Sequence, residues 1–178
     1  LNRYMSSSLF HKPEQWGIKL FEFIRIHKIN GQQLLVNPDI LESLDDFLPV
    51  LGEAIDALEH KDPETPHEKL KPELKSRGFE PGWGHNAGRI RETMGMLQAL
   101  FYEPRSADLE EFISRLPMIS KVAILSPHGW FAQENVLGKP DTGGQVIYIL
   151  DQVRALEFHL RKEFELSGID VIPRVVVV

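Results

Sequence analysis

Residues 121–157, KVAILSPHGWFAQENVLGKPDTGGQVIYILDQVRALE, decide the fold of the C-terminal part of this 178-residue chain. The apolar run 122–125 is too short for a helix and is followed at once by serine, proline and glycine, which predicts a buried strand ending in a loop. The loop continues to Gly143 and Gly144. Apolar residues then recur at helical spacing: Val146, Ile149, Leu150, Val153, Leu156 and Leu160. The order strand, long loop, double glycine and helix predicts the start of an alternating β/α unit.

The double glycine before the predicted helix suggests a chemical role for this segment. The first amides of a helix have no intrahelical partner and carry the positive end of the helix dipole. Glycines at Gly143 and Gly144 would let a phosphate group approach these amides closely. The spacing matches neither GxGxxG nor GxxxxGK[ST], and double glycines also occur in ordinary turns, so both interpretations stay open.

His128 lies in the loop, just past the predicted strand. Loops between a strand and a helix usually take about two to six residues, whereas this one takes about fifteen, and long loops at the carboxyl ends of strands are often functional. The imidazole could hydrogen-bond a sugar hydroxyl or act as an acid or base. It could equally brace the loop.

The chain before this unit has the pattern of a helical module. Helical periodicity predicts helices over 14–27, from Pro38 to about residue 58 with a kink or division at Pro49, and over 68–77. Two more follow, one after Asn86 and one entered through the capping candidates Ser106 and Asp108. Trp83, between two glycines, either packs in the core or marks a binding surface, and packing is favoured. We place the domain boundary at Pro117, with module 1–117 before it and unit 118–178 after it.

The composition limits the possible functions. A chain with 42% hydrophobic and 26% charged residues is typical of a soluble globular protein, and the net charge of −6 disfavours nucleic acid or an anionic membrane as a general partner. It contains no cysteine, and its histidines lack metal-ligand spacing, so no metal site is expected. No run approaches the roughly twenty apolar residues that cross a bilayer. Since the start also lacks the layout of a signal peptide, we expect a cytoplasmic protein. Because the chain begins at Leu1 and ends within Val175–Val178, we expect it to be a fragment of a longer protein.

The block SPHGWFAQENVLGKPDTGGQVIYILDQVRALE closely resembles the start of the glycosyltransferase region of the sucrose synthase family. The blocks LNRYMSSSLFHKPE, GWGHNAGRIRETM and LEEFISRLPM also resemble their counterparts in that family, in the same order. The resemblance implies a GT-B enzyme with two Rossmann-like domains. Residues 1–117 would be the helical module, similar to the early-nodulin-peptide-binding domain of plant members, and 118–178 the truncated start of the first Rossmann-like domain.

The resemblance also implies a reaction. The family transfers glucose reversibly between sucrose and a nucleoside diphosphate, giving D-fructose and UDP-glucose or ADP-glucose, with retention at the anomeric carbon. It needs no metal or other cofactor, and its members are usually homotetramers. By resemblance, Gly143 and Gly144 would approach the diphosphate and the glucose, Gln145 the nucleobase, and His128 the sugar in the acceptor pocket. The cationic and acidic residues of the donor site would lie beyond Val178, so the isolated chain is expected to be inactive.

Two other interpretations remain. The chain could serve as a helical protein-interaction or oligomerisation module, which exposed apolar surface on helices 14–27 and 85–102 would favour. It could also belong to another GT-B transferase with a different acceptor, although the resemblance of the whole helical module disfavours this. The preference for UDP or ADP stays open.

Overall fold

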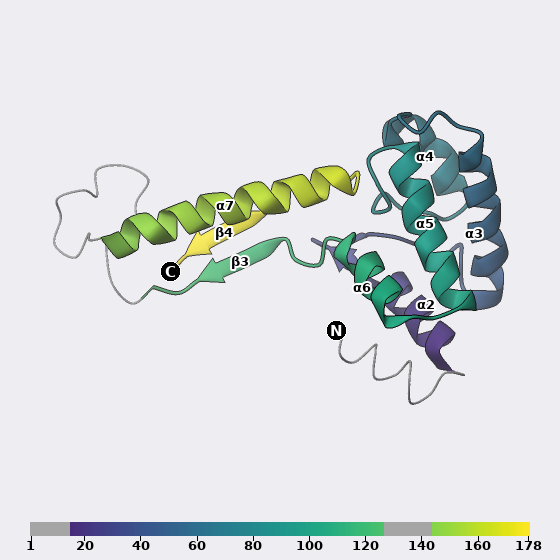
Figure 1. The fold of residues 1–178 in the computed structure, drawn as a ribbon, viewed down its shortest axis with the longest axis horizontal. Coiled ribbons are helices and arrows are strands. Elements are labelled where there is room, and N and C mark those ends of the chain that lie inside the picture. The colour runs from purple at the N-terminus through teal and green to yellow at the C-terminus, as the bar shows by residue number, and fades with distance from the viewer. Residues whose placement is uncertain (1–14, 127–143) are drawn as a thin grey trace.

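The structure is a computed structural model that describes residues 15–126 and 144–178 of the chain. Figure 1 shows a helical module and, extending from it, a unit of two strands and one long helix. The helices are α2 (Trp16–Ile26), α3 (Leu44–Glu59), α4 (His67–Ser76), α5 (Ala87–Tyr102), α6 (Ser106–Ser114) and α7 (Gly144–Leu166). The strands are β1 (Lys28–Ile29), β2 (Gln32–Gln33), β3 (Lys121–Ile124) and β4 (Arg174–Val177). The predicted class, a helical module followed by a β-α-β unit, is confirmed.

The core of the helical module is built around α3 and α5, which pack against each other. Aromatic rings connect the surrounding elements: the ring of Phe47 lies 5.1 Å from that of Phe21 and 6.2 Å from that of Phe79. Phe79 in turn meets Trp83 edge-on at 5.7 Å. All four side chains are buried, so the module has one continuous apolar core.

Side-chain caps fix the starts of α3 and α5. The hydroxyl oxygen of Ser43 accepts a hydrogen bond from the amide of Asp46 at 3.2 Å, and the side-chain oxygen of Asn86 accepts one from the amide of Arg89 at 2.9 Å. Each cap satisfies one of the amides that a helix N-terminus leaves unpaired. The helix predicted after Asn86 is therefore confirmed.

Three local predictions in the helical module are wrong. Helix α3 begins at Leu44 rather than near Pro38; Pro49 lies inside it and does not divide it, while the alternative, a kink at Pro49, stays a prediction. Ser106 is the first residue of α6 and not its cap; its hydroxyl makes no hydrogen bond with any described residue. The segment around Asn30, expected only to end a helix, turns back to pair β1 with β2.

Trp83 packs in the core, as the sequence favoured, because only 2% of its surface is exposed and its indole N–H donates to the carbonyl of Leu35 at 2.9 Å. We expect Trp83→Phe to lower the free energy of unfolding by about 1–2 kcal/mol, since it removes this hydrogen bond and part of the buried ring. Urea denaturation of the chain measures the change. Unchanged stability would mean that the indole N–H and the second ring contribute nothing to the core.

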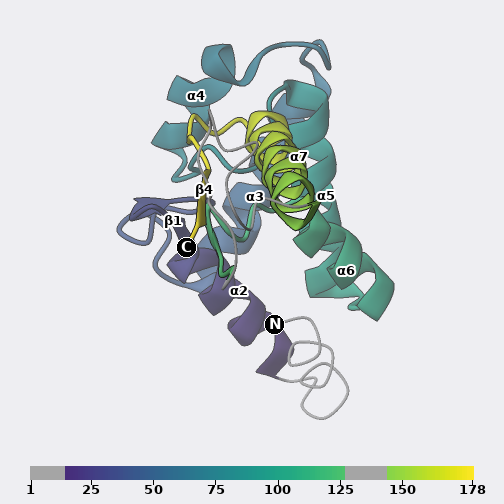
Figure 2. The same cartoon turned by 90° about the vertical axis from the view of Figure 1, so that its left-hand side faces the viewer.

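The C-terminal unit pairs β3 with β4 in parallel, with Lys121 opposite Arg174 and Ile124 opposite Val177. The amide of Val178 donates to the carbonyl of Ile124 at 2.9 Å, and the amide of Ser126 donates to the carbonyl of Val178 at 2.8 Å. Helix α7 lies between the two strands in the chain and packs on β4; Figure 2 shows it nearly end-on beside β4. The sequence predicted a buried strand, but the side chains of β3 are half-buried or exposed. The reason is that β4 is its one partner strand among the described residues.

Candidate functional site

The carboxyl end of β3 and the N-terminus of α7 lie at the same end of the β-α-β unit (Figure 1). Parallel pairing brings the carboxyl ends of β3 and β4 side by side, and residues 127–143 connect that edge to the first turn of α7 at Gly144. In open α/β sheets ligands bind at the carboxyl ends of the strands, where helix N-termini offer free amides. The arrangement can therefore hold an anionic group at the first turn of α7.

The predicted site residues divide into two groups. His128 and Gly143 lie outside the described residues. Gly144 and Gln145 are the first two residues of α7, so their backbone is placed where the sequence predicts it. The roles assigned to these four residues stay predictions.

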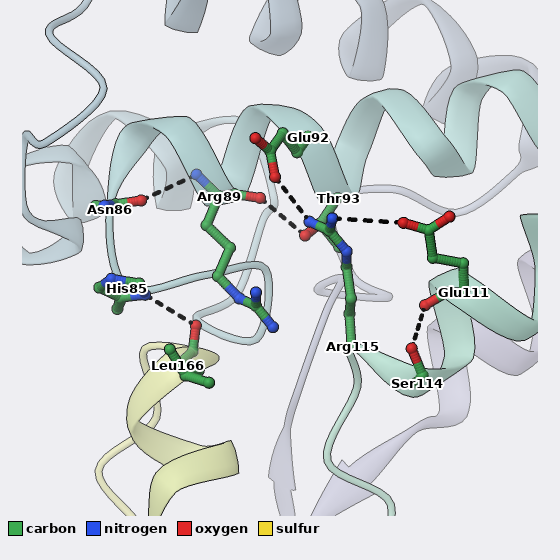
Figure 3. Close-up of polar contacts among 9 residues, drawn as sticks. All are labelled: His85, Asn86, Arg89, Glu92, Thr93, Glu111, Ser114, Arg115 and Leu166. Carbon is green, nitrogen blue, oxygen red and sulfur yellow. Dashed lines mark hydrogen bonds and ion pairs between the residues drawn. The ribbon is translucent and has the colours of Figure 1, made fainter.

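The opposite end of α7 is attached to the helical module (Figure 3). The last helical carbonyl, that of Leu166, accepts hydrogen bonds from the backbone amide of His85 at 3.1 Å and from its Nδ1 at 3.2 Å. Gly168, which follows the helix, has a φ of +73°, and a Cβ atom there would lie 2.4 Å from the carbonyl oxygen of Gly84. The absence of a side chain at Gly168 thus permits the close approach of the module and the C-terminus of α7.

The segment between the two parts is also fixed by long-range hydrogen bonds. Nε2 of His27 lies 3.0 Å from the carbonyl oxygen of Pro117, and the hydroxyl of Ser120 donates to the side-chain oxygen of Asn30 at 2.9 Å. The hydroxyl of Ser167 lies 3.3 Å from the carbonyl of Arg115. Hydrogen bonds therefore join Pro117 and Ser120 to the helical module, and Ser167 to the residue that follows α6. The domain boundary at Pro117 stays a prediction.

A cluster of charges lies beside this junction (Figure 3). Nη1 of Arg115 is 3.1 Å from a carboxylate oxygen of Glu92, and Nη2 is 3.7 Å from one of Glu111. Arg89 reaches from α5 toward the end of α7, and its guanidinium makes no hydrogen bond or ion pair with any described residue. Burial, and to a lesser extent the charge of Arg115, lowers the pKa of Arg89, while Glu92 opposes the shift.

Sequence reasoning missed this cluster and the contacts of His85. The run GFEPGWGHNAGRI is rich in glycine, but the residues that it contacts at the end of α7 lie far away along the chain. Residues 84 and 168, for example, meet only once the chain has folded.

His67 gives the stability of the chain a pH dependence. Its ring is buried, with 6% of the residue exposed, and Nδ1 lies 3.6 Å from a carboxylate oxygen of Glu68, beyond ordinary hydrogen-bond length. Burial lowers its pKa and outweighs the opposing effect of Glu68, while Lys71 lowers the pKa further. The neutral ring is therefore favoured in the folded chain, and the unfolded chain binds the proton first as the pH falls.

The folded chain should therefore have its full stability, as far as this ring is concerned, above the unfolded pKa of about 6.5. Its free energy of unfolding should decrease as the pH is lowered below that value. The fall in stability between about pH 7 and pH 5 should be flatter in His67→Gln than in the wild type. Urea denaturation across this pH range measures both slopes. Equal slopes in the wild type and His67→Gln would exclude His67 as the cause.

Two general features concern the described ranges as a whole. Within residues 15–126 and 144–178, no group of three or more His, Cys, Asp and Glu side chains could hold a metal ion. No helix in these ranges is both long and apolar enough to cross a membrane.

Comparison with known proteins assigns both parts of the chain. The model of the sucrose synthase EPBD domain matches residues 1–85, and the model of the sucrose synthase first GT-B domain matches residues 107–178. Curated sucrose synthases match the chain almost from end to end. The one from Thermosynechococcus vestitus is 47% identical over 99% of the chain, that from Nitrosomonas europaea 46% over 100%, and one from Solanum tuberosum 45% over 100%.

The chain spans 22% of the length of each of these relatives. The matches are collinear with both the helical module and the β-α-β unit, which confirms the resemblance carried by the sequence blocks. The chain belongs to the sucrose synthase family, a family of glycosyltransferases, and carries its EPBD domain and the start of its first GT-B domain.

Proposed function

We propose that this chain is part of a sucrose synthase that transfers glucose reversibly between sucrose and a nucleoside diphosphate. The products are D-fructose and UDP-glucose or ADP-glucose, formed with retention at the anomeric carbon and without a metal or other cofactor. The observation that carries the proposal is the match of 43–47% identity to sucrose synthases over the whole chain, through both of its parts.

The geometry of the β-α-β unit supports a role in nucleotide binding. The first turn of α7 begins at Gly144, at the carboxyl edge of β3 and β4, and its free amides would donate to the diphosphate. These donors would stabilise the negative charge that develops on the leaving diphosphate as the bond to glucose breaks. Gly143 would let the phosphates approach, Gln145 would lie by the nucleobase, and His128 would contact the acceptor sugar.

The remaining parts of the proposal concern the full-length protein. The donor site needs cationic and acidic side chains from the second Rossmann-like domain, and the cleft needs that domain to exclude water and align the two sugars. We therefore expect the isolated chain to be inactive. The full-length protein would be a cytoplasmic homotetramer that binds neither nucleic acid nor membrane.

A role as an interaction module alone receives little support from the exposed surface. Helix α2 exposes Ile18 and Ile26, but the exposed Glu22 lies between them, and Tyr102 is the large exposed apolar residue of α5 within the described ranges. Small, interrupted apolar surfaces of this kind are common on monomeric proteins.

The test is sucrose cleavage by the full-length protein with UDP or ADP, with nucleotide-glucose and fructose measured together. We expect both products in equal amounts, and a large loss of rate in His128→Ala without loss of folding. A protein that binds nucleotide but forms no nucleotide-glucose from sucrose would contradict the proposal. Activity of the isolated chain would contradict the predicted need for the second domain.

A further inference from the structure

A small cavity lies where the helical module meets the last turns of α7, with a volume of about 260 Å³. Its charged lining comes from α5 (Arg89), the residue after α6 (Arg115), and α7 (His159, Lys162 and Glu163). The cavity is thus surrounded by side chains from three separate elements. It is built only when the module and the β-α-β unit are in contact.

Most of these charges already have partners. Arg115 pairs with Glu92 and Glu111, and Nε2 of His159 lies 3.1 Å from a carboxylate oxygen of Glu163. Arg89 and Lys162 have no ion-pair partner within residues 15–126 and 144–178. Arg89 and Lys162 are therefore cavity-lining cations that no carboxylate contacts among the described residues, since Glu163 is paired with His159.

The guanidinium of Arg89 is held in a setting that disfavours its charge. Residue Arg89 is half-buried, and Figure 3 shows its side chain directed toward the end of α7, with the dashed lines at Arg89 ending only on its backbone atoms. Burial and the nearby Arg115 lower its pKa. An anion between Arg89 and Lys162 would relieve both the desolvation of the guanidinium and its repulsion by Arg115.

We propose that this cavity binds a phosphate group, either as the free ion or as the phosphate of a small sugar phosphate. A dianionic phosphate balances the two unpaired cations, and its tetrahedral oxygens can accept from the guanidinium fork of Arg89 and the ammonium group of Lys162 at the same time. The volume lies below the range of about 300–1,000 Å³ that is usual for larger organic ligands. This size favours a phosphate group with few attached atoms over a whole nucleotide.

The cavity is separate from the proposed nucleotide site. Lys162 lies eighteen residues beyond Gly144 on the same helix, which corresponds to about 27 Å along the axis at about 1.5 Å per residue. Phosphate binding here thus requires no sucrose, nucleotide or turnover. The inference can fail or hold independently of the proposed function.

The test is calorimetric titration of inorganic phosphate into the full-length protein, at constant ionic strength with chloride as the replaced anion. The pocket variant combines Arg89→Gln with Lys162→Gln. The control variant combines Arg91→Gln with Arg154→Gln, which removes the same two charges from the same two helices but leaves the cavity lining unchanged. We expect phosphate to bind the wild type and the control alike, and the pocket variant at least about tenfold more weakly, or about 1.4 kcal/mol.

Glucose 6-phosphate, with glucose as its blank, distinguishes the two sources of the phosphate group. Binding of the sugar phosphate that is weakened only in the pocket variant supports the proposal even if the free ion binds poorly. If the double variant fails to fold, Lys162→Gln alone repeats the test, because this side chain is exposed. Equal affinity in the pocket and control variants, or no binding of either phosphate to the wild type, would overturn the proposal.

Discussion

Gly168→Val is expected to lower the free energy of unfolding by about 3–5 kcal/mol, because two costs add at this position. The backbone has a φ of +73°, which a β-branched residue adopts only under strain. The new Cβ would also lie 2.4 Å from the carbonyl oxygen of Gly84, a backbone atom that cannot rotate away. The substitution should loosen the contact between the helical module and α7, and urea denaturation measures its cost.

Gly31→Val is the matched control for this substitution. Gly31 also has a positive φ, of +82°, but no atom lies within 4 Å of the position that a Cβ would take. Gly31→Val should therefore lower the free energy of unfolding only by the backbone strain, about 1–2 kcal/mol. If both substitutions cost the same, the close approach of Gly168 to Gly84 contributes nothing to stability, and the junction does not depend on it.

Gly144→Val is expected to reduce kcat/KM for sucrose cleavage by the full-length protein about 100-fold or more, equivalent to about 2.7 kcal/mol of lost transition-state stabilisation. Gly144 is the first residue of α7, and a branched side chain there would hinder the approach of the diphosphate to the free amides of the first turn. Steady-state kinetics with UDP and with ADP measure the loss.

The control for Gly144→Val is Gly95→Val, within α5. No neighbouring atom lies within 4 Å of the position that a Cβ would occupy at Gly95, so the substitution tests the general effect of valine in a helix. We expect its kcat/KM to stay close to that of the wild type. An equal loss of activity in both variants would mean that Gly144 acts through folding and not at the site.

The helices and the β-α-β unit were predictable because their signals are local. Apolar residues at helical spacing predicted α5 after Asn86 and α7 after the double glycine, and in the structure the side chain of Asn86 caps an amide three residues on. The short apolar runs before residue 126 and at the C-terminus form β3 and β4 to within a residue or two. Each prediction depended on groups close together in the chain.

Competing local interactions explain the errors. Asn30 and Gly31 have φ values of 51° and 82°, which suit a two-residue hairpin turn, and this turn pairs β1 with β2 where only a helix end was expected. At the next helix, Ser43 caps α3 through Asp46, so the apolar residues before it belong to the loop despite their helical spacing. In both cases turn or cap chemistry overrides hydrophobic periodicity.

The junction could not be predicted in the same way, because it depends on distance in space. His85 bonds to Leu166, and Gly84 meets Gly168, only after the module and α7 have packed together. Of the predicted site residues, Gly144 and Gln145 take their expected place at the start of α7, whereas His128 and Gly143 lie outside the described residues. Their roles depend on the family resemblance and on experiment.

Hydrogen exchange tests most directly whether the first turn of α7 binds the nucleotide diphosphate. The amides of residues 144–146 have no intrahelical partners, so they should exchange rapidly in the free full-length protein and more slowly once the phosphates of UDP or ADP accept hydrogen bonds from them. The first turn of α5, capped by Asn86, should show no such change. Unchanged exchange in residues 144–146 at a saturating nucleotide concentration would contradict the proposed site.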